Sequence, residues 1–158
     1  MRARLRFLRS HILGARCSMM TRGTVLVVDD EAPVREVLRG VLTKAGYDVV
    51  VASNGAAALE LVHAGPRPDL IVLDLMMPVM TGFEVLGALR ATKKWAKIPV
   101  IVLTGTLGYS TDHLGVDAVL AKPFEANDVD AAIAVALGSR RKKTPTAKKK
   151  TRTRRRSA

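Results

Sequence analysis

Residues 70–82 read Leu-Ile-Val-Leu-Asp-Leu-Met-Met-Pro-Val-Met-Thr-Gly, and the arrangement of the whole 158-residue chain follows from this segment. Its first four residues are all apolar, which is typical of a strand covered on both faces, as strands are in parallel sheets. The run ends on a carboxylate, Asp74, and a proline and a glycine then mark a loop before a helical apolar pattern. Because ligands of such sheets gather at the carboxyl ends of the strands, we expect Asp74 to lie at a binding edge.

Four further apolar runs alternate with helical patterns along the chain. The strand-like runs are residues 25–28, 47–52, 98–103 and 118–121. The helical patterns run from Pro33 to Gly46, over 56–64, after residue 82, and over 125–137. Right-handed crossovers between successive strands produce a parallel sheet. We therefore predict an α/β fold, a doubly wound five-stranded parallel sheet with helices on both faces.

The predicted strands deliver polar side chains to one edge of the sheet. Asp29 and Asp30 follow the first strand, Thr104 ends the fourth and Lys122 follows the fifth. Asp29, Asp30 and Asp74 bring three carboxylates together, and these repel one another; a few oxygen ligands that leave room for water and phosphate suit Mg²⁺. A metal and an ammonium also offset the charge of a phosphoryl group that moves onto a carboxylate. Asp74 would be the nucleophile, with the Thr104 hydroxyl donating to a phosphoryl oxygen and Lys122 supplying positive charge.

Four motifs in this order resemble the response-regulator receiver domain of two-component signalling. They are Val28-Asp29-Asp30-Glu31, Leu73-Asp74-Leu75-Met76-Met77-Pro78 with Thr81-Gly82, Leu103-Thr104-Gly105, and Lys122-Pro123-Phe124. The resemblance covers residues 24–137 and is to a chemotaxis-type, single-domain receiver with a basic C-terminal tail. It implies the flavodoxin-like strand order 2-1-3-4-5.

The resemblance also implies a function for the site. Asp74 would accept a phosphoryl group from a sensor histidine kinase or a phosphotransfer protein. Asp30 and Asp74 would bind Mg²⁺ directly together with the Met76 backbone carbonyl, and Asp29 would act through water. Such a protein is not an enzyme beyond promoting its own phosphorylation and dephosphorylation. It signals in the cytoplasm by contact with an output protein that the sequence does not identify.

Two positions depart from the family pattern. Receivers usually carry an aromatic residue three positions before the lysine, whereas this chain has Val119 there. The connection between Thr104 and Lys122 is about one helical turn short and has Gly108 and Gly115 within it, so we expect a stunted fourth helix. The Lys122–Pro123 peptide is often cis in the family, and the sequence permits it.

The charge divides the chain into three parts: an arm of residues 1–23, the receiver domain of residues 24–137 and a tail of residues 138–158. The net charge is +12, and seventeen of the 26 Lys and Arg lie outside the receiver domain, which holds nine basic and fourteen acidic residues. We expect the arm to be disordered, or to precede a true start at Met19 or Met20. The single cysteine excludes an internal disulfide. No apolar run approaches the length that spans a bilayer, so we expect a soluble protein.

The tail should be disordered because its like charges repel and it holds almost no apolar residues. Its basic residues are Arg140, Arg141, Lys142, Lys143, Lys148, Lys149, Lys150, Arg152, Arg154, Arg155 and Arg156. They make the tail a candidate for non-specific binding of DNA or another polyanion, with a membrane surface the less favoured partner. We expect no folded helix-turn-helix output domain in these 21 residues.

Two other functions are open at this stage. The first is a nucleic-acid-binding protein that uses the receiver fold only as a scaffold, but such a scaffold has no use for the full set of acids, hydroxyl and lysine. The second is a phosphatase with an aspartyl nucleophile. It is disfavoured because the position two residues after Asp74, where such enzymes carry a second acid, holds Met76.

Overall fold

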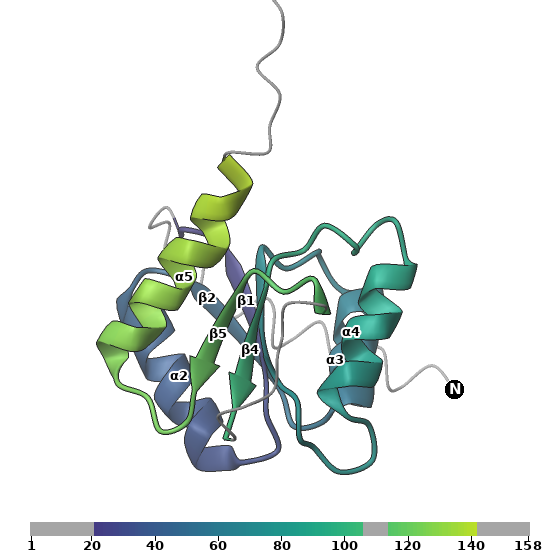
Figure 1. The fold of residues 1–158 in the computed structure, drawn as a ribbon, viewed down its shortest axis with the longest axis horizontal. Helices are drawn as coiled ribbons and strands as arrows, with labels where there is room; N and C mark the ends of the chain where they lie inside the picture. Colours follow the sequence, from purple (N-terminus) through teal and green to yellow (C-terminus); the bar gives the residue numbers. More distant parts are fainter. Residues whose placement is uncertain (1–20, 106–113, 142–158) are drawn as a thin grey trace, which may run out of the picture.

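The computed structural model describes residues 21–105 and 114–141, which form alternating strands and helices (Figure 1). The strands are β1 (Thr24–Val28), β2 (Asp48–Ala52), β3 (Leu70–Asp74), β4 (Val100–Thr104) and β5 (Ala118–Ala121). The helices are α2 (Ala32–Lys44), α3 (Gly55–Ala64), α4 (Gly82–Ala91) and α5 (Ala126–Arg141). None of the helices in these two ranges is long and apolar enough to cross a membrane.

The strands form one parallel sheet in the order β2-β1-β3-β4-β5, as predicted. Helices α2 and α5 cover one face of the sheet, and α3 and α4 cover the other (Figure 1). The doubly wound fold class is therefore confirmed. Because every strand runs in the same direction, the residues that follow the strands meet at one edge of the sheet.

Strand β3 lies in the middle of the sheet, and all five of its residues are buried. Ile71 and Leu73 pack into the apolar cluster under α3 and α4. Leu70 and Val72 pack into the cluster under α2 and α5. Each fully buried side chain of this kind contributes about 1.5–3 kcal/mol. The two-sided burial explains why the β3 sequence is continuously apolar instead of alternating.

Side-chain caps fix the starts of two helices. Asn54 accepts a hydrogen bond from the Ala57 N–H and begins α3. Thr81 and Glu84 form a reciprocal capping box that begins α4. The backbone N–H and the hydroxyl of Thr81 both donate to the Glu84 carboxylate and lower its pKa. These caps fix where the loops before α3 and α4 end.

The loop between β3 and α4 contains a backbone conformation that is unusual for its residue. Val79 has a φ of 70° and is 92% exposed. The left-handed region costs an L-residue about 1–2 kcal/mol. A β-branched residue with such a φ is an outlier, and strain of this kind gathers at functional sites. In this chain it lies five residues after Asp74.

Helix α5 is longer than the sequence pattern predicted. It continues past Leu137 to Arg141, so the first four residues assigned to the disordered tail are helical. A lone Gly138 costs a helix only about 1 kcal/mol. The rest of the tail, the arm up to residue 20 and most of the connection predicted to hold a stunted helix (residues 106–113) lie outside the described residues.

Candidate functional site

Two buried carboxylates meet at the carboxyl edge of the sheet. Val28 of β1 pairs with Leu73 of β3, so the residues that follow them, Asp29 and Asp74, are neighbours. Asp29 is 0% exposed and Asp74 is 4% exposed. A third carboxylate, that of Glu31, joins them from the turn before α2. One oxygen from each of the three lies within 4.8 Å of the others.

A single ammonium group contacts all three acids. Lys122 Nζ lies 2.7 Å from Asp74 Oδ2, 2.8 Å from Asp29 Oδ2 and 3.2 Å from Glu31 Oε1. Burial by itself would lower the pKa of this lysine, but the contacts with Asp29 and Asp74 outweigh burial and raise that pKa well above its ordinary value. Lys122 is therefore a fixed positive charge, and three carboxylates around one lysine leave the cluster negative.

The Asp29 carboxylate has one oxygen engaged and one free of hydrogen bonds. Oδ1 accepts from the Glu31 N–H at 2.8 Å. Oδ2 is buried, and its contact with Lys122 lacks hydrogen-bond geometry, so it accepts no hydrogen bond from any described residue. Burial raises the pKa of the Asp29 carboxyl and the Asp74 charge adds to the rise, while Lys122 and the Glu31 N–H oppose it. The three carboxylates of Asp29, Glu31 and Asp74 outnumber the one ammonium, and such a set of oxygen ligands fits a hard divalent cation.

The other residues predicted for the site differ in whether they lie beside the acids at this edge of the sheet. Asp74 Oδ1 accepts from the Met76 N–H at 3.0 Å, which places the Met76 backbone beside the acids. Thr104 is buried at the end of β4, and its carbonyl accepts from the Lys122 N–H at 2.8 Å. Asp30 is exposed and is not a member of the three-carboxylate cluster. The Lys122–Pro123 peptide is cis.

Glu31 has no role in the predicted site, although the residue stands inside the first motif. Its backbone precedes α2, and its carboxylate lies beside Lys122. Two features of the sequence could have indicated its place. Glu31 directly follows two acids, and it lies two residues before Pro33, a residue type favoured in the first turn of a helix. A turn this tight keeps three successive acids close to the end of β1.

A surface groove of about 470 Å³ adjoins the site on the side of α2. Its lining residues are Glu31, Pro33, Val34, Val37, Lys122, Pro123 and Phe124. Five of these seven are apolar, and Val37 is 55% exposed. The groove therefore joins an apolar surface to the charged lysine of the site.

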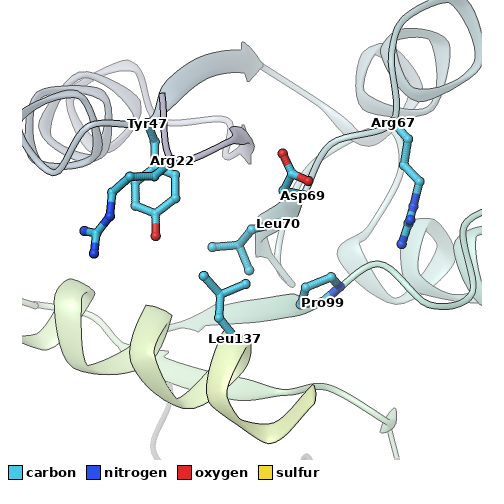
Figure 2. Close-up of a pocket in the computed structure, with 7 residues that line it drawn as sticks. All are labelled: Arg22, Tyr47, Arg67, Asp69, Leu70, Pro99 and Leu137. Carbon is cyan, nitrogen blue, oxygen red and sulfur yellow. The ribbon is translucent and has the colours of Figure 1, made fainter. Parts of the chain in front are cut away.

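A second pocket, of about 270 Å³, lies at the opposite edge of the sheet (Figure 2). Its lining includes Leu70, the first residue of β3, whereas Asp74 is the last. Arg22, at the rim, lies 5.6 Å from the centre of the Tyr47 ring and donates to the Ala45 carbonyl at 3.3 Å. These contacts attach Arg22 to the C-terminal end of α2. The pocket is separate from the three carboxylates.

Comparisons with known proteins agree with this geometry. A model of the response regulator receiver domain matches residues 25–134. The response regulator MprA of Mycolicibacterium vanbaalenii is 42% identical over 125 residues, which are 77% of this chain and 52% of MprA. A probable transcriptional regulator, ycf27, of Guillardia theta is 39% identical over 74% of this chain and 46% of its own length. This chain thus spans about half the length of the curated relatives it matches.

Two solved structures that resemble this chain are covered by it almost over their full length. The chemotaxis protein CheY4 of Vibrio cholerae superposes with a TM-score of 0.67 at 32% identity, over 72% of this chain and 97% of CheY4. A response regulator from Chloroflexus aurantiacus superposes with a TM-score of 0.68 at 30% identity, over 73% of this chain and 98% of that one. On its sequence motifs, its strand order and the family match, this chain belongs to the response regulator receiver domain family.

Proposed function

We propose that this chain is a phosphorylation-controlled signalling protein in which Asp74 accepts a phosphoryl group from the phosphohistidine of a sensor histidine kinase or a phosphotransfer protein. The observation that carries the proposal is the contact of Lys122 Nζ with Asp74 Oδ2 at 2.7 Å, beside the buried carboxylate of Asp29. Receiver domains are signalling modules, and this one would pass its signal to an output protein by direct contact.

The transfer forms a bond between an Asp74 carboxylate oxygen and phosphorus and breaks the bond between phosphorus and the histidine nitrogen. The attacking carboxylate and the phosphoryl group are both negative, so their approach needs positive charge. Lys122 supplies one such charge and can donate to a phosphoryl oxygen once the group is in place. Thr104 ends the neighbouring strand, from which its hydroxyl would donate to another oxygen.

Mg²⁺ is the cation that this donor set suits, because oxygen ligands from few carboxylates leave room for water and phosphate. Asp74 would hold it directly and Asp29 through water, both from the buried side, and Glu31 lies close enough to join them. The family resemblance adds Asp30 and the Met76 carbonyl as ligands. When bound, the metal would offset the negative charge of the phosphoryl oxygens.

The groove beside Lys122 supports a protein as the phosphodonor. It presents exposed apolar side chains from α2 and from the segment that follows β5, and Lys122 itself lines it. Exposed apolar surface next to a reactive group marks a site of protein contact. A partner that docks here would hold its phosphohistidine at the edge where Asp74 lies.

Calorimetric titration with Mg²⁺ tests which acids bind the metal. We expect the wild type to bind one ion, and Asp30→Asn to weaken binding by more than about 10-fold, because removing a direct ligand costs at least as much as removing a supporting group. Asp29→Asn should weaken binding by at least about 10-fold through the lost water-mediated contact. Asp48→Asn, which changes an exposed acid at the far edge of the sheet, is the matched control. If Asp30→Asn binds Mg²⁺ as tightly as the wild type, Asp30 is not a ligand, and the metal is held by the cluster of Asp29, Glu31 and Asp74.

We also propose that the basic tail binds DNA or another polyanion without sequence preference. The support is its eleven basic residues, which contrast with an acidic receiver domain. Such binding would localise the signalling domain and would not replace it. A protein that used the receiver fold only as a scaffold would not need Asp29, Asp74 and Lys122 in mutual contact.

The salt dependence of DNA binding tests the role of the tail. If about half of the eleven charges meet phosphates, a plot of log affinity for duplex DNA against log salt should have a slope of roughly −5. Deleting residues 142–158, which leaves α5 intact, should flatten that slope. Anionic liposomes at the same ionic strength show whether a membrane surface competes. An equal slope with and without the tail would contradict this part of the proposal.

A further inference from the structure

Arg35 makes a contact that plays no part in the phosphoryl transfer proposed above. It lies in the first turns of α2, and its Nη1 donates to the main-chain carbonyl of Asp29 at 2.7 Å. Hydrogen bonds from a charged donor at this distance are among the stronger ones in proteins. The backbone N–H of Arg35 also donates to the Glu31 carbonyl at 3.2 Å. Arg35 therefore ties the start of α2 to both ends of the acidic turn that follows β1.

The carbonyl that Arg35 holds belongs to Asp29, whose carboxylate is one of the three in the acidic cluster. Val28 is the last residue of β1 in the ladders with β2 and β3, so Asp29 stands just beyond the regular sheet. Its N–H donates to the Ala52 carbonyl at 3.3 Å, and its Oδ1 accepts from the Glu31 N–H at 2.8 Å. With the Arg35 bond, the N–H, the carbonyl and one carboxylate oxygen of Asp29 are all fixed. The other oxygen, Oδ2, lies 2.8 Å from Lys122 Nζ, within the group of three carboxylates that would hold the cation.

We propose that Arg35 is a positioning residue for the metal site: by anchoring the Asp29 carbonyl it holds the Asp29 carboxylate in the direction that a divalent cation requires. This inference rests on the proposed function. It concerns metal binding before any phosphoryl transfer. Arg35 touches neither the cation position nor a reacting atom by any contact found in the described residues.

The action runs through the backbone and not through the charge of the guanidinium. After burial, the groups that shift the pKa of Asp29 are Lys122, the Glu31 N–H and Asp74, and Arg35 is not among them. Groups that orient a metal ligand from behind typically change metal affinity by about 10–100-fold when they are removed. We take the lower figure, because Arg35 holds the main chain of Asp29 and not its carboxylate.

The test is calorimetric titration of the full-length, unphosphorylated protein with Mg²⁺. Arg35→Ala should raise the Kd about 10-fold. Arg35→Lys should recover part of the loss, because an ammonium can still donate to the same carbonyl. Arg39→Ala is the matched control: it removes the same charge from the same helix, where the Arg39 guanidinium lies 3.8 Å from Glu36. It should leave the Kd unchanged.

A second readout separates positioning from general loss of structure. At saturating Mg²⁺, Arg35→Ala should be phosphorylated by a small phosphodonor at nearly the wild-type rate, with only the half-saturating Mg²⁺ concentration raised. A fall in maximal rate without a change in Kd would overturn the inference. So would an equal loss in Arg35→Ala and Arg39→Ala, or no recovery in Arg35→Lys.

The inference and the proposed function fail in different ways. A wild-type protein that binds no Mg²⁺ contradicts the proposed function and the inference together. If the wild type and Arg35→Ala bind Mg²⁺ with equal affinity, the inference alone is contradicted. Thermal unfolding of each variant verifies that the compared proteins are folded.

Discussion

Replacing Gly82 with alanine should lower the free energy of unfolding by about 3 kcal/mol, because the added methyl group has no space. A Cβ at this position would clash with the Asp74 carbonyl oxygen and lie 2.8 Å from Leu75 Cα. Both neighbours are backbone atoms and cannot rotate away as side chains do. Gly82 is also held in place, since its N–H donates to the Leu75 carbonyl at 3.0 Å. Urea denaturation measures the loss directly.

The control for this substitution lies on the same helix. Gly87 is in the interior of α4, and no described atom outside its own stretch of helix lies within 4 Å of an added Cβ there. Gly87→Ala should therefore stabilise the protein by about 0.5–1 kcal/mol, the ordinary gain of alanine over glycine in a helix. Equal stabilities of the two variants would show that the start of α4 does not press against the loop after β3. Since that loop directly follows Asp74, Gly82→Ala should disturb the site as well.

The sequence was sufficient to predict the sheet and the residues at its edge. A strand buried on both faces needs a continuous apolar run, and residues 70–73 have one, so the place of Asp74 at the end of a central strand followed from side-chain chemistry alone. The same logic located Asp29, Thr104 and Lys122. Their mutual approach needs only parallel strands, which right-handed connections impose.

The direction of each side chain could not be predicted in the same way. Asp29, Asp30 and Glu31 are consecutive acids in one tight turn, and sequence does not say which of them face inward. The structure buries Asp29, brings Glu31 to Lys122 and leaves Asp30 exposed. The contact of Arg35 with a carbonyl six residues earlier also depends on turn geometry that no pattern of residue types encodes.

Asp74→Asn should abolish phosphoryl acceptance completely, because the substitution replaces the nucleophilic carboxylate with a neutral amide and retains the shape of the side chain. An amide has no anionic oxygen to attack phosphorus. The positive charge that assists attack would still be present, since Lys122 also contacts Asp29 at 2.8 Å and Glu31 at 3.2 Å. The variant therefore separates the nucleophile from its surroundings. We expect it to remain folded, because the strand that carries it keeps all its apolar contacts.

The most direct test is the intact mass of the protein after incubation with a small acyl phosphate and Mg²⁺. The wild type should gain one phosphoryl group. Neither Asp74→Asn nor the wild type without a divalent cation should gain any. Labelling of Asp74→Asn to the wild-type level would contradict the account, because phosphorylation would then take place on another residue and the acids around Lys122 would have a different purpose.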